Sequence, residues 1–187
     1  MLAYVFWHWP YPNVDRVSYK TLLLNFHRSL ALSKPEGFGF SVVFQIKDAP
    51  WVGINMEACE DWYVIEGSWA LDLLNEAAVS HSRKEPHDRV AQGAAGGVGG
   101  LYRFRSGQPH VGQSQFAVWL SKPLGTSYEA FYESLSPWTS RPGVGLWGRQ
   151  MVLGPAPEFC LLSPEKIDLP ESCNGLALTL ETIWPVA

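Results

Sequence analysis

The chain has 187 residues, of which 47% are hydrophobic, 17% are charged and 13% are aromatic, including nine tryptophans. Because disordered chains are rich in charge and poor in aromatic residues, we expect a folded protein with a substantial core. Fourteen Lys and Arg against 18 Asp and Glu give a net charge of −4, which disfavours broad nucleic-acid binding. No apolar run approaches the roughly 18 residues of a membrane span, so we expect neither nucleic acid nor membrane as a partner.

The cysteines and the N-terminus indicate a reducing compartment. Cys59, Cys160 and Cys173 are odd in number and form no CxxC pair, so they do not describe a disulfide framework. The chain enters a strand-like pattern at residue 2 without the basic start or small-residue cleavage site of a signal peptide. We therefore predict a soluble cytoplasmic protein.

The first half is predicted to have the order βαββαβ. Residues 2–9 are aromatic and β-branched and end at Pro10, which is typical of a strand. Apolar residues at helical spacing predict a helix over 18–32, with Ser18 as its N-cap. Further elements are expected as strands over 38–46 and 62–67, a helix over 69–79 and a strand over 101–105.

The second half repeats this order with local matches. Val5-x4-Pro10 corresponds to Val118-x4-Pro123, and Ser18-Tyr19-Lys20 corresponds to Ser127-Tyr128-Glu129. The main loss lies at the second helix of the second half, where residues 165–169 leave about one turn. We therefore predict an internal duplication into residues 1–108 and 109–187, which together form one compact unit.

A βαββαβ unit leaves one face of its sheet without helices, and two such units can cover each other face to face. This arrangement resembles the dimeric α+β barrel superfamily, with two ferredoxin-like repeats fused in one chain over residues 2–185. Phe26-His27-Arg28 is similar to the helix of EthD-type members. The resemblance implies an α+β fold in which two antiparallel sheets pack face to face as a barrel and the second repeat lacks most of its second helix.

In such a barrel alternate strand residues face the interior. Alignment of Val5 with Val118 places Ala3, Val5 and Trp7 on the helix side, and we expect Phe38, Phe40, Val42 and Phe44 there too. An aromatic cavity with a few polar groups suits a small hydrophobic or aromatic ligand. The residues predicted to line it are Tyr4, Phe6, His8, Gln45, Glu66, Trp119, Trp147, Arg149 and Met151.

His8 and Arg149 are the predicted catalytic residues. The imidazole of His8 suits a general base, and the guanidinium of Arg149 suits an anion-stabilising group. His8 is also typical of a strand-end histidine half in water, and Arg149 of a structural pair with Glu66 or Glu181. His27 either orients a ligand or lies on the solvated side of its helix.

Other motifs favour structural interpretations. His81-x5-His87-Asp88 lies in a charged stretch typical of a solvated loop and has no standard zinc spacing. The glycine cluster 93–100 follows a loop and precedes a strand, which is the wrong order for a phosphate-binding loop, and we expect a flexible connection. We predict no metal and no cofactor.

The resemblance implies three functional alternatives. Members of the superfamily include cofactor-free oxygenases, isomerases and haem-binding peroxidases, and a haem protein would require a histidine such as His8 facing the cavity. The first hypothesis is a cofactor-free oxygenase or isomerase that acts on a small aromatic compound. The others are a non-catalytic ligand-binding protein and a structural barrel, and a pocket below roughly 300 Å³ would favour the structural barrel.

The missing helix also predicts an apolar patch near Phe159, Leu161 and Leu180. Either the C-terminal residues 182–186 or a second chain would cover it. We expect a monomer, which is already a pseudo-dimer, or a homodimer.

Overall fold

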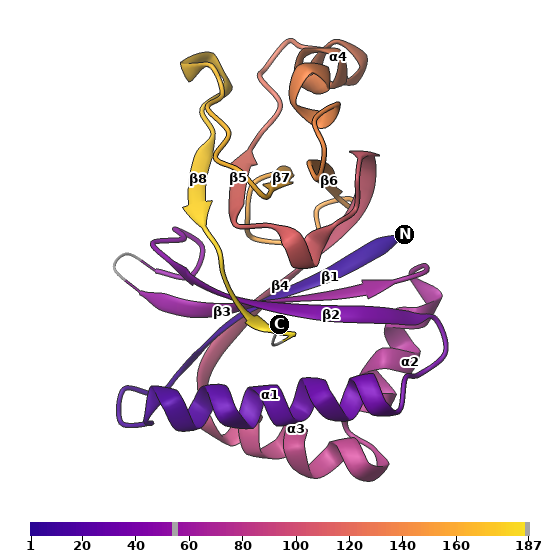
Figure 1. Ribbon diagram of the computed structural model, residues 1–187, viewed down its shortest axis with the longest axis vertical. Coiled ribbons are helices and arrows are strands. Elements are labelled where there is room, and N and C mark those ends of the chain that lie inside the picture. The colour runs from indigo at the N-terminus through magenta and orange to yellow at the C-terminus, as the bar shows by residue number, and fades with distance from the viewer. Residues whose placement is uncertain (54–55, 186–187) are drawn as a thin grey trace.

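The computed structural model describes residues 1–53 and 56–185, whose nine strands form a single antiparallel sheet (Figure 1). The elements of the first half are β1 (Leu2–Pro10), α1 (Arg16–Leu32), β2 (Phe38–Lys47), β3 (Glu57–Ile65), α2 (Trp69–Ala78), α3 (His81–Gly93) and β4 (Ala94–Gly107). Those of the second half are β5 (Phe116–Leu120), α4 (Tyr128–Thr139), β6 (Gly145–Arg149), β7 (Phe159–Ser163), β8 (Leu176–Thr179) and β9 (Glu181–Trp184), with 3-10 turns at Val111–Gln113 and Glu171–Cys173.

The strand order is β8-β5-β7-β6-β4-β1-β3-β2-β9. The first half contributes β4-β1-β3-β2 and the second half β8-β5-β7-β6, which is the same ferredoxin-like order repeated. The two sheets join through the β4–β6 pair and curl into a nearly closed α+β barrel. The predicted fold class is therefore confirmed, including the loss of most of the second helix in the second half.

One segment of chain lies at both edges of the sheet. β8 pairs with β5 at one edge and β9 pairs with β2 at the other, and only Leu180 separates β8 from β9. The Leu180 side chain is buried in the barrel interior, and its backbone N–H donates to the carbonyl of Gln115 at 2.8 Å. This bend therefore connects the two edges of the sheet through a single residue.

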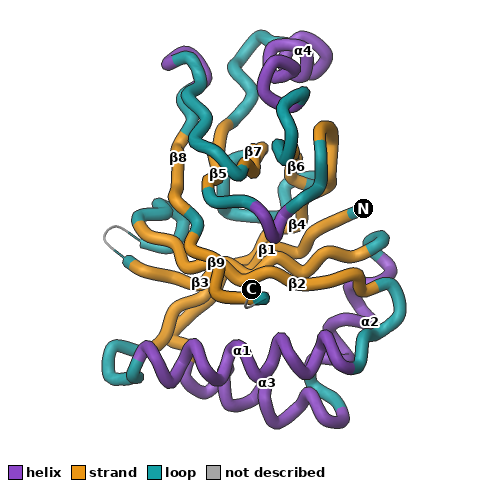
Figure 2. Tube along the Cα trace, viewed as in Figure 1, coloured by secondary structure: helices purple, strands orange, loops and turns teal. Residues whose placement is uncertain are grey.

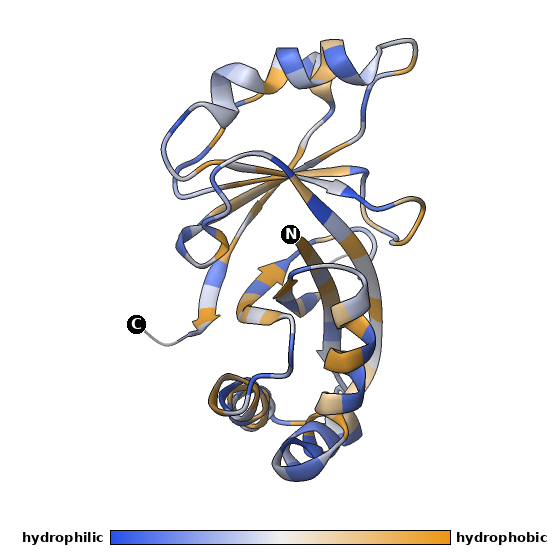
Figure 3. Ribbon diagram, turned by 90° about the vertical axis from the view of Figure 1, so that its right-hand side faces the viewer, coloured by the Kyte–Doolittle hydropathy of each residue, from blue (hydrophilic) through white to orange (hydrophobic). Residues whose placement is uncertain are grey.

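The helices are distributed unequally. α1, α2 and α3 cover the outer face of the first half, whereas α4 lies over the second half at the opposite end of the molecule (Figures 1 and 2). The helices carry hydrophilic and hydrophobic residues together, as expected where one side of a helix covers a sheet (Figure 3). No helix within residues 1–53 and 56–185 has the length and apolarity to span a membrane.

The barrel interior is packed with aromatic side chains. Trp7, Trp62, Trp119 and Trp147 are fully buried there and contact one another, mostly edge to face. Edge-to-face contacts complement the charge distribution of aromatic rings and fill volume efficiently. The interior is thus a core of indole rings.

The predicted faces of β1 and β2 are wrong. Ala3, Val5 and Trp7 lie in the interior, whereas Tyr4, Phe6 and His8 face the helices. Likewise Val42 and Phe44 lie inside and Val43 outside, although Phe38, before a bulge, does face the helices as expected. Val118 packs under α4, whereas Val5 lies in the barrel interior, so the alignment of Val5 with Val118 is one residue out of register. A shift of one residue moves every side chain of a strand to the opposite face of the sheet.

Two expected loops are regular elements. The charged stretch forms α3, which Arg83 fixes by donating from Nε to the Ala77 carbonyl at 2.7 Å and from a terminal nitrogen to the Ser33 carbonyl at 2.6 Å. The glycine cluster 93–100, expected as a flexible connection, runs from the last residue of α3 into β4 and pairs along β1. The N-cap of α1 is Asp15, not Ser18, and Ser127 caps α4.

The expected apolar patch on the second half does not exist. Phe159 and Leu161 are buried with α4 and Ile167, and Leu180 is buried in the interior. The loop after β7 therefore covers the face that a second helix would cover. The C-terminal strand pairs with β2 instead, and Val186 lies outside the described residues.

Candidate active site

A cavity of about 700 Å³ lies between the sheet of the first half and its three helices. This volume is within the range of small-molecule sites, but the cavity lies outside the barrel interior, where a cavity was expected and where indole rings are packed instead. Its walls are mostly apolar and come from α1, α2 and α3, with Leu23, Phe26, Leu71, Leu74 and Val90 as the main side chains. Its floor comes from the helix-facing residues of β1, β3 and β4.

The floor carries nearly parallel rings. Along β1, Phe6 lies at 20° to Tyr4 and at 20° to His8, with ring centroids 6.0 and 5.3 Å apart. On β3, the Tyr63 ring lies at 26° to Tyr4 and at 20° to His27. A floor of this kind presents a flat, apolar surface to a ligand.

Glycines of β4 make this floor possible. A Cβ added at Gly99 would lie 2.8 Å from Cε2 of Tyr4, and one added at Gly97 would overlap Cζ of Phe6. The rings of β1 therefore extend sideways across the bare backbone of β4. Side chains at these positions would displace the two rings, so the floor of the cavity in this form requires glycine at both positions.

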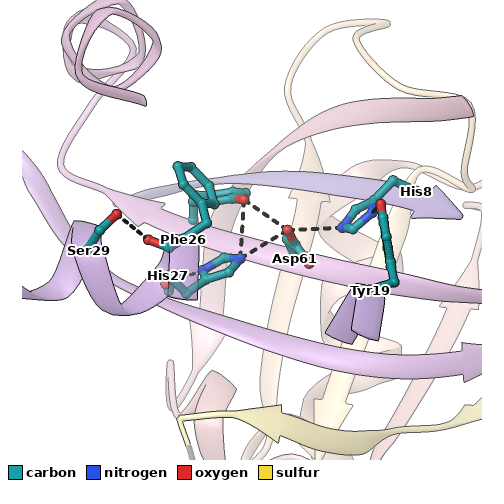
Figure 4. Close-up of polar contacts among 8 residues, drawn as sticks. His8, Tyr19, Phe26, His27, Ser29 and Asp61 are labelled. Carbon is teal, nitrogen blue, oxygen red and sulfur yellow. Dashed lines mark hydrogen bonds and ion pairs between the residues drawn. The ribbon is translucent and has the colours of Figure 1, made fainter. Parts of the chain in front are cut away.

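Asp61 is the centre of the polar network on the floor (Figure 4). Its Oδ2 accepts a hydrogen bond from the Tyr63 hydroxyl at 2.8 Å and lies 3.1 Å from Nε2 of His27. Nε2 of His8 approaches the same oxygen at 3.2 Å, an ion-pair distance without the alignment of a hydrogen bond. Asp61 is 1% exposed, and its Oδ1 has no partner among the described residues.

Two hydroxyl groups hold the outer nitrogens of the histidines. Nδ1 of His8 lies 2.6 Å from the Tyr19 hydroxyl, and Nδ1 of His27 lies 2.7 Å from the Ser41 hydroxyl. α1 provides Tyr19 and His27 two turns apart, and these residues reach down to His8 on β1 and Ser41 on β2. The arrangement is a continuous chain of polar side chains from Tyr19 through His8, Asp61 and His27 to Ser41.

The electrostatics favour an ionised Asp61. Burial alone would raise the pKa of Asp61, but the electrostatic attraction of the His8 and His27 imidazoles and the hydrogen bond from His27 hold it below its usual range. Burial first, and then the Asp61 charge, raises the pKa of Tyr63 well above its usual value and also raises that of Tyr4. The floor therefore combines a buried carboxylate with neutral phenols.

A second buried carboxyl group occupies the barrel interior. Glu60 accepts hydrogen bonds from the indole nitrogens of Trp7 at 2.6 Å and Trp62 at 2.7 Å. Burial raises the pKa of Glu60 to about 7, although the two indole hydrogen bonds oppose this shift. This group lies on the opposite face of β3 from Asp61 and does not line the cavity.

Three predicted site residues line this cavity, namely His8, Tyr4 and Phe6. Trp119 and Trp147 face the barrel interior as expected, but there they pack among other indoles. Their roles in ligand binding stay predictions, because the cavity lies on the other face of the sheet.

The remaining predicted residues lie away from the cavity. Gln45 contacts Lys20 and donates to Glu57 at 3.2 Å, and Glu66 is exposed. Arg149 donates to the carbonyls of Gly154 and Ala156 at 3.0 and 2.8 Å, which supports a loop. Met151 is 78% exposed.

Sequence reasoning missed Asp61, Tyr19, Tyr63 and Ser41 as members of the site. A signal for Asp61 existed, because two adjacent acidic residues interrupt an otherwise apolar and aromatic strand, and buried acids need partners. His27 also had one, since it shares a helix face with Leu23 and Leu30 and is therefore buried. No sequence signal identified the hydroxyl groups of Tyr19, Tyr63 and Ser41, because their contacts depend on how α1 packs on the sheet.

The polar network does not suit a metal or a haem. Within residues 1–53 and 56–185, no group of three or more His, Cys, Asp and Glu side chains is arranged to hold a metal ion. His8 directs one ring nitrogen at Tyr19 and the other at Asp61, so neither is directed at the open cavity as an axial haem ligand would be.

Comparisons with known proteins support the fold alone. No family model matches the chain, and no curated protein matches its sequence. Two of the solved structures that match the chain cover nearly all of it. One is described as a "putative monooxygenase" from Lactobacillus acidophilus NCFM, with 12% identity and a TM-score of 0.54 over 97% of this chain and 93% of that one.

The other is described as an anthrone oxidase-like protein, with 10% identity and a TM-score of 0.53 over 97% of this chain and 91% of that one. At such identities the likeness shows a shared architecture and not a shared reaction. The chain thus has an α+β barrel fold similar to that of monooxygenase-like and oxidase-like proteins.

Proposed function

We propose that this protein is a cofactor-free enzyme, an oxygenase or isomerase, that removes a proton from a small planar aromatic compound. The observation that carries the proposal is the His8–Asp61 pair on the floor of a 700 Å³ apolar cavity. The site is therefore the cavity between sheet and helices, and not the barrel interior that the sequence suggested.

The shape of the cavity supports a flat ligand. Parallel rings form its floor, and aliphatic side chains and Phe26 form its walls. Offset stacking on Phe6 would favour an aromatic body, and the apolar walls would exclude water around it. The polar groups are concentrated on the floor, with Asp72, Asn75 and His87 from α2 and α3 also lining the cavity.

The pair supports base chemistry. Imidazole accepts a proton near neutral pH, and a buried carboxylate stabilises the imidazolium that forms, as in catalytic triads. Loss of a proton converts an acidic aromatic substrate into a resonance-stabilised anion. Return of the proton to another position gives an isomerase, and transfer of electrons from the anion to O₂ gives an oxygenase.

The names of the two similar structures favour the oxygenase branch and suggest anthrone as a test compound. Anthrone and O₂ give anthraquinone and water, so one O₂ is consumed for each anthrone without a cofactor. We expect the purified protein to accelerate oxygen uptake with anthrone, measured with an oxygen electrode and by the absorbance of anthraquinone.

His8→Ala tests the base. Removal of a general base lowers kcat by on the order of 10²–10⁴-fold, so oxygen uptake should fall to near the uncatalysed rate while the protein remains folded. His110→Ala is the matched control, since His110 is exposed and its side chain is outside the cavity. Full turnover by His8→Ala would contradict the assignment.

A non-catalytic ligand-binding protein is the second candidate. The observation that favours it is the enclosure of His8, which is 2% exposed with both ring nitrogens facing other side chains. Calorimetry would measure the binding of anthraquinone, and separate assays would measure oxygen uptake with anthrone and proton exchange at the acidic carbon of anthrone. Tight binding without oxygen uptake or proton exchange would establish this alternative.

A further inference from the structure

We propose that Tyr19 is a catalytic residue that passes the substrate proton to His8. This inference rests on the proposed function and names the group that meets the substrate. Its starting point is the position of Tyr19, which lines the cavity and has its hydroxyl 2.6 Å from Nδ1 of His8 (Figure 4).

The neighbours of His8 favour one tautomer of its neutral ring. Nε2 lies 3.2 Å from the Asp61 carboxylate, which would repel a lone pair on that nitrogen, so the favoured tautomer carries its hydrogen on Nε2. The remaining lone pair of the neutral ring is then on Nδ1, and the Tyr19 hydroxyl donates to it. His27 has the same arrangement, with Nε2 toward Asp61 and Nδ1 toward Ser41.

This geometry leaves a substrate no direct path to the basic nitrogen. The lone pair on Nδ1 of His8 is covered by the Tyr19 hydroxyl, and the opposite nitrogen faces Asp61. A substrate in the cavity meets the phenol oxygen of Tyr19, which keeps a free lone pair while its hydrogen is donated to His8. Tyr19 is therefore placed between the ligand and the base.

The transfer balances as two coupled proton movements. The substrate proton forms a new O–H bond with Tyr19 as the original Tyr19 proton leaves that oxygen and forms an N–H bond with Nδ1 of His8. Tyr19 ends as a neutral phenol, His8 becomes an imidazolium beside Asp61, and the substrate retains the electron pair as an anion.

The surroundings of Tyr19 favour coupled over stepwise transfer. Burial, followed by the nearby Cys59 and Asp61 groups, raises the pKa of Tyr19 far above its usual value. A free phenolate at this position is therefore disfavoured, whereas a coupled exchange never forms one. The tyrosine is suited to relay a proton and unsuited to hold a negative charge.

Tyr19→Phe tests the relay, because it removes the hydroxyl and keeps the ring that packs in the cavity. Calorimetry would compare 2-naphthol, 2-methoxynaphthalene and naphthalene as probes, which share a ring system and differ in the hydroxyl. We expect the unmodified protein to bind 2-naphthol about tenfold more tightly than the other two, the worth of one hydrogen bond. In Tyr19→Phe this preference should vanish while affinity for naphthalene is kept.

Turnover provides the second readout. Oxygen uptake with anthrone should fall at least 10²-fold in Tyr19→Phe, as in His8→Ala, and remain unchanged in Tyr11→Phe, which alters an exposed tyrosine outside the cavity. Full turnover by Tyr19→Phe beside an inactive His8→Ala would overturn the relay and leave the proposed function intact.

The probes also separate failure of the relay from failure of the proposed function. Absence of anthrone turnover in the unmodified protein would count against the function, and the naphthol comparison would still decide whether Tyr19 meets the ligand. Retention of the hydroxyl preference by Tyr19→Phe would overturn the inference. So would equal affinity of the unmodified protein for 2-naphthol and 2-methoxynaphthalene, a measurement that needs no variant.

Discussion

Glu60 and Asp61 are neighbours on β3, and both carboxyl groups are fully buried, but they lie on opposite faces of the sheet. Glu60 points into the barrel interior and is held by two indole N–H groups. Asp61 points toward the helices and is held by two imidazoles and a phenol.

The difference lies in what the donors can do. An indole N–H donates but does not ionise at neutral pH, so the two partners of Glu60 in the packed core cannot change charge. Imidazoles both accept and donate protons, so the surroundings of Asp61 can change charge during a reaction. The cavity lies on the same face of the sheet as Asp61 and its titratable donors. It is formed where the glycines of β4 leave room for the rings of β1 and where α1–α3 form the opposite walls.

Replacement of Asp61 should have the largest effect on stability. Asp61→Asn keeps the size of the side chain but removes the charged acceptor to which His27 and Tyr63 donate, and each hydrogen bond to a charged group contributes about 1.5–3 kcal/mol. Urea unfolding would measure this loss. Asp168→Asn is the control, because its carboxylate pairs with Lys166 at an exposed position, where such pairs contribute little.

The two carboxyl groups should give opposite pH dependences of the free energy of unfolding. The pKa of Asp61 is lower in the folded state, so its contribution is complete above about pH 4 and is lost as the pH falls. The pKa of Glu60 is raised from 4.5 to about 7, so its protonation stabilises the fold at low pH, and this stabilisation is lost as the pH rises through that range.

Glu60→Gln separates these two contributions. In the unmodified protein, the titration of Glu60 should lower the free energy of unfolding by up to about 3 kcal/mol between pH 4.5 and 7. Glu60→Gln has no titrating group there, so this decline should disappear. Asp61→Asn should leave that decline in place and remove the loss at acidic pH. An unchanged slope in Glu60→Gln would show that the interior carboxyl does not titrate there.

Gly97→Ala should have a smaller effect on stability and a large one on binding. The added methyl group overlaps the ring of Phe6, and overpacking of this kind costs about 1–3 kcal/mol. Because Phe6 lines the cavity, displacement of its ring should lower the affinity for 2-naphthol. Gly112→Ala is the control, since its added Cβ would make ordinary contact with Val42 at 3.6 Å. Unchanged naphthol affinity in Gly97→Ala would argue against a ligand on this floor.

Much of the fold could be predicted from the sequence, because helical and alternating apolar patterns, Ser127 and the Pro10 stop are local signals. The orientation of β1 could not, since both of its faces are apolar or aromatic and only alternation was available. Glycine is rare within strands, so the start of β4 resembled a connection; its glycines become intelligible only beside Tyr4 and Phe6.

The candidate site was predicted only in part for the same reason. His8, Tyr4 and Phe6 share one face of β1, so they lie together in the cavity even though that face points toward the helices and not into the barrel. Arg149 and Met151 were attached to them through an alignment of the repeats that was one residue out of step. Asp61 and Tyr19 join His8 through contacts between distant segments, which no local pattern contains.

The most direct test of the account is a crystal structure of the protein with bound 2-naphthol. We expect the ligand to lie in the cavity between the sheet and α1–α3, stacked near Phe6, with its hydroxyl against Tyr19. Density for the ligand among the tryptophans around Glu60, with the cavity on the helix side empty, would contradict it.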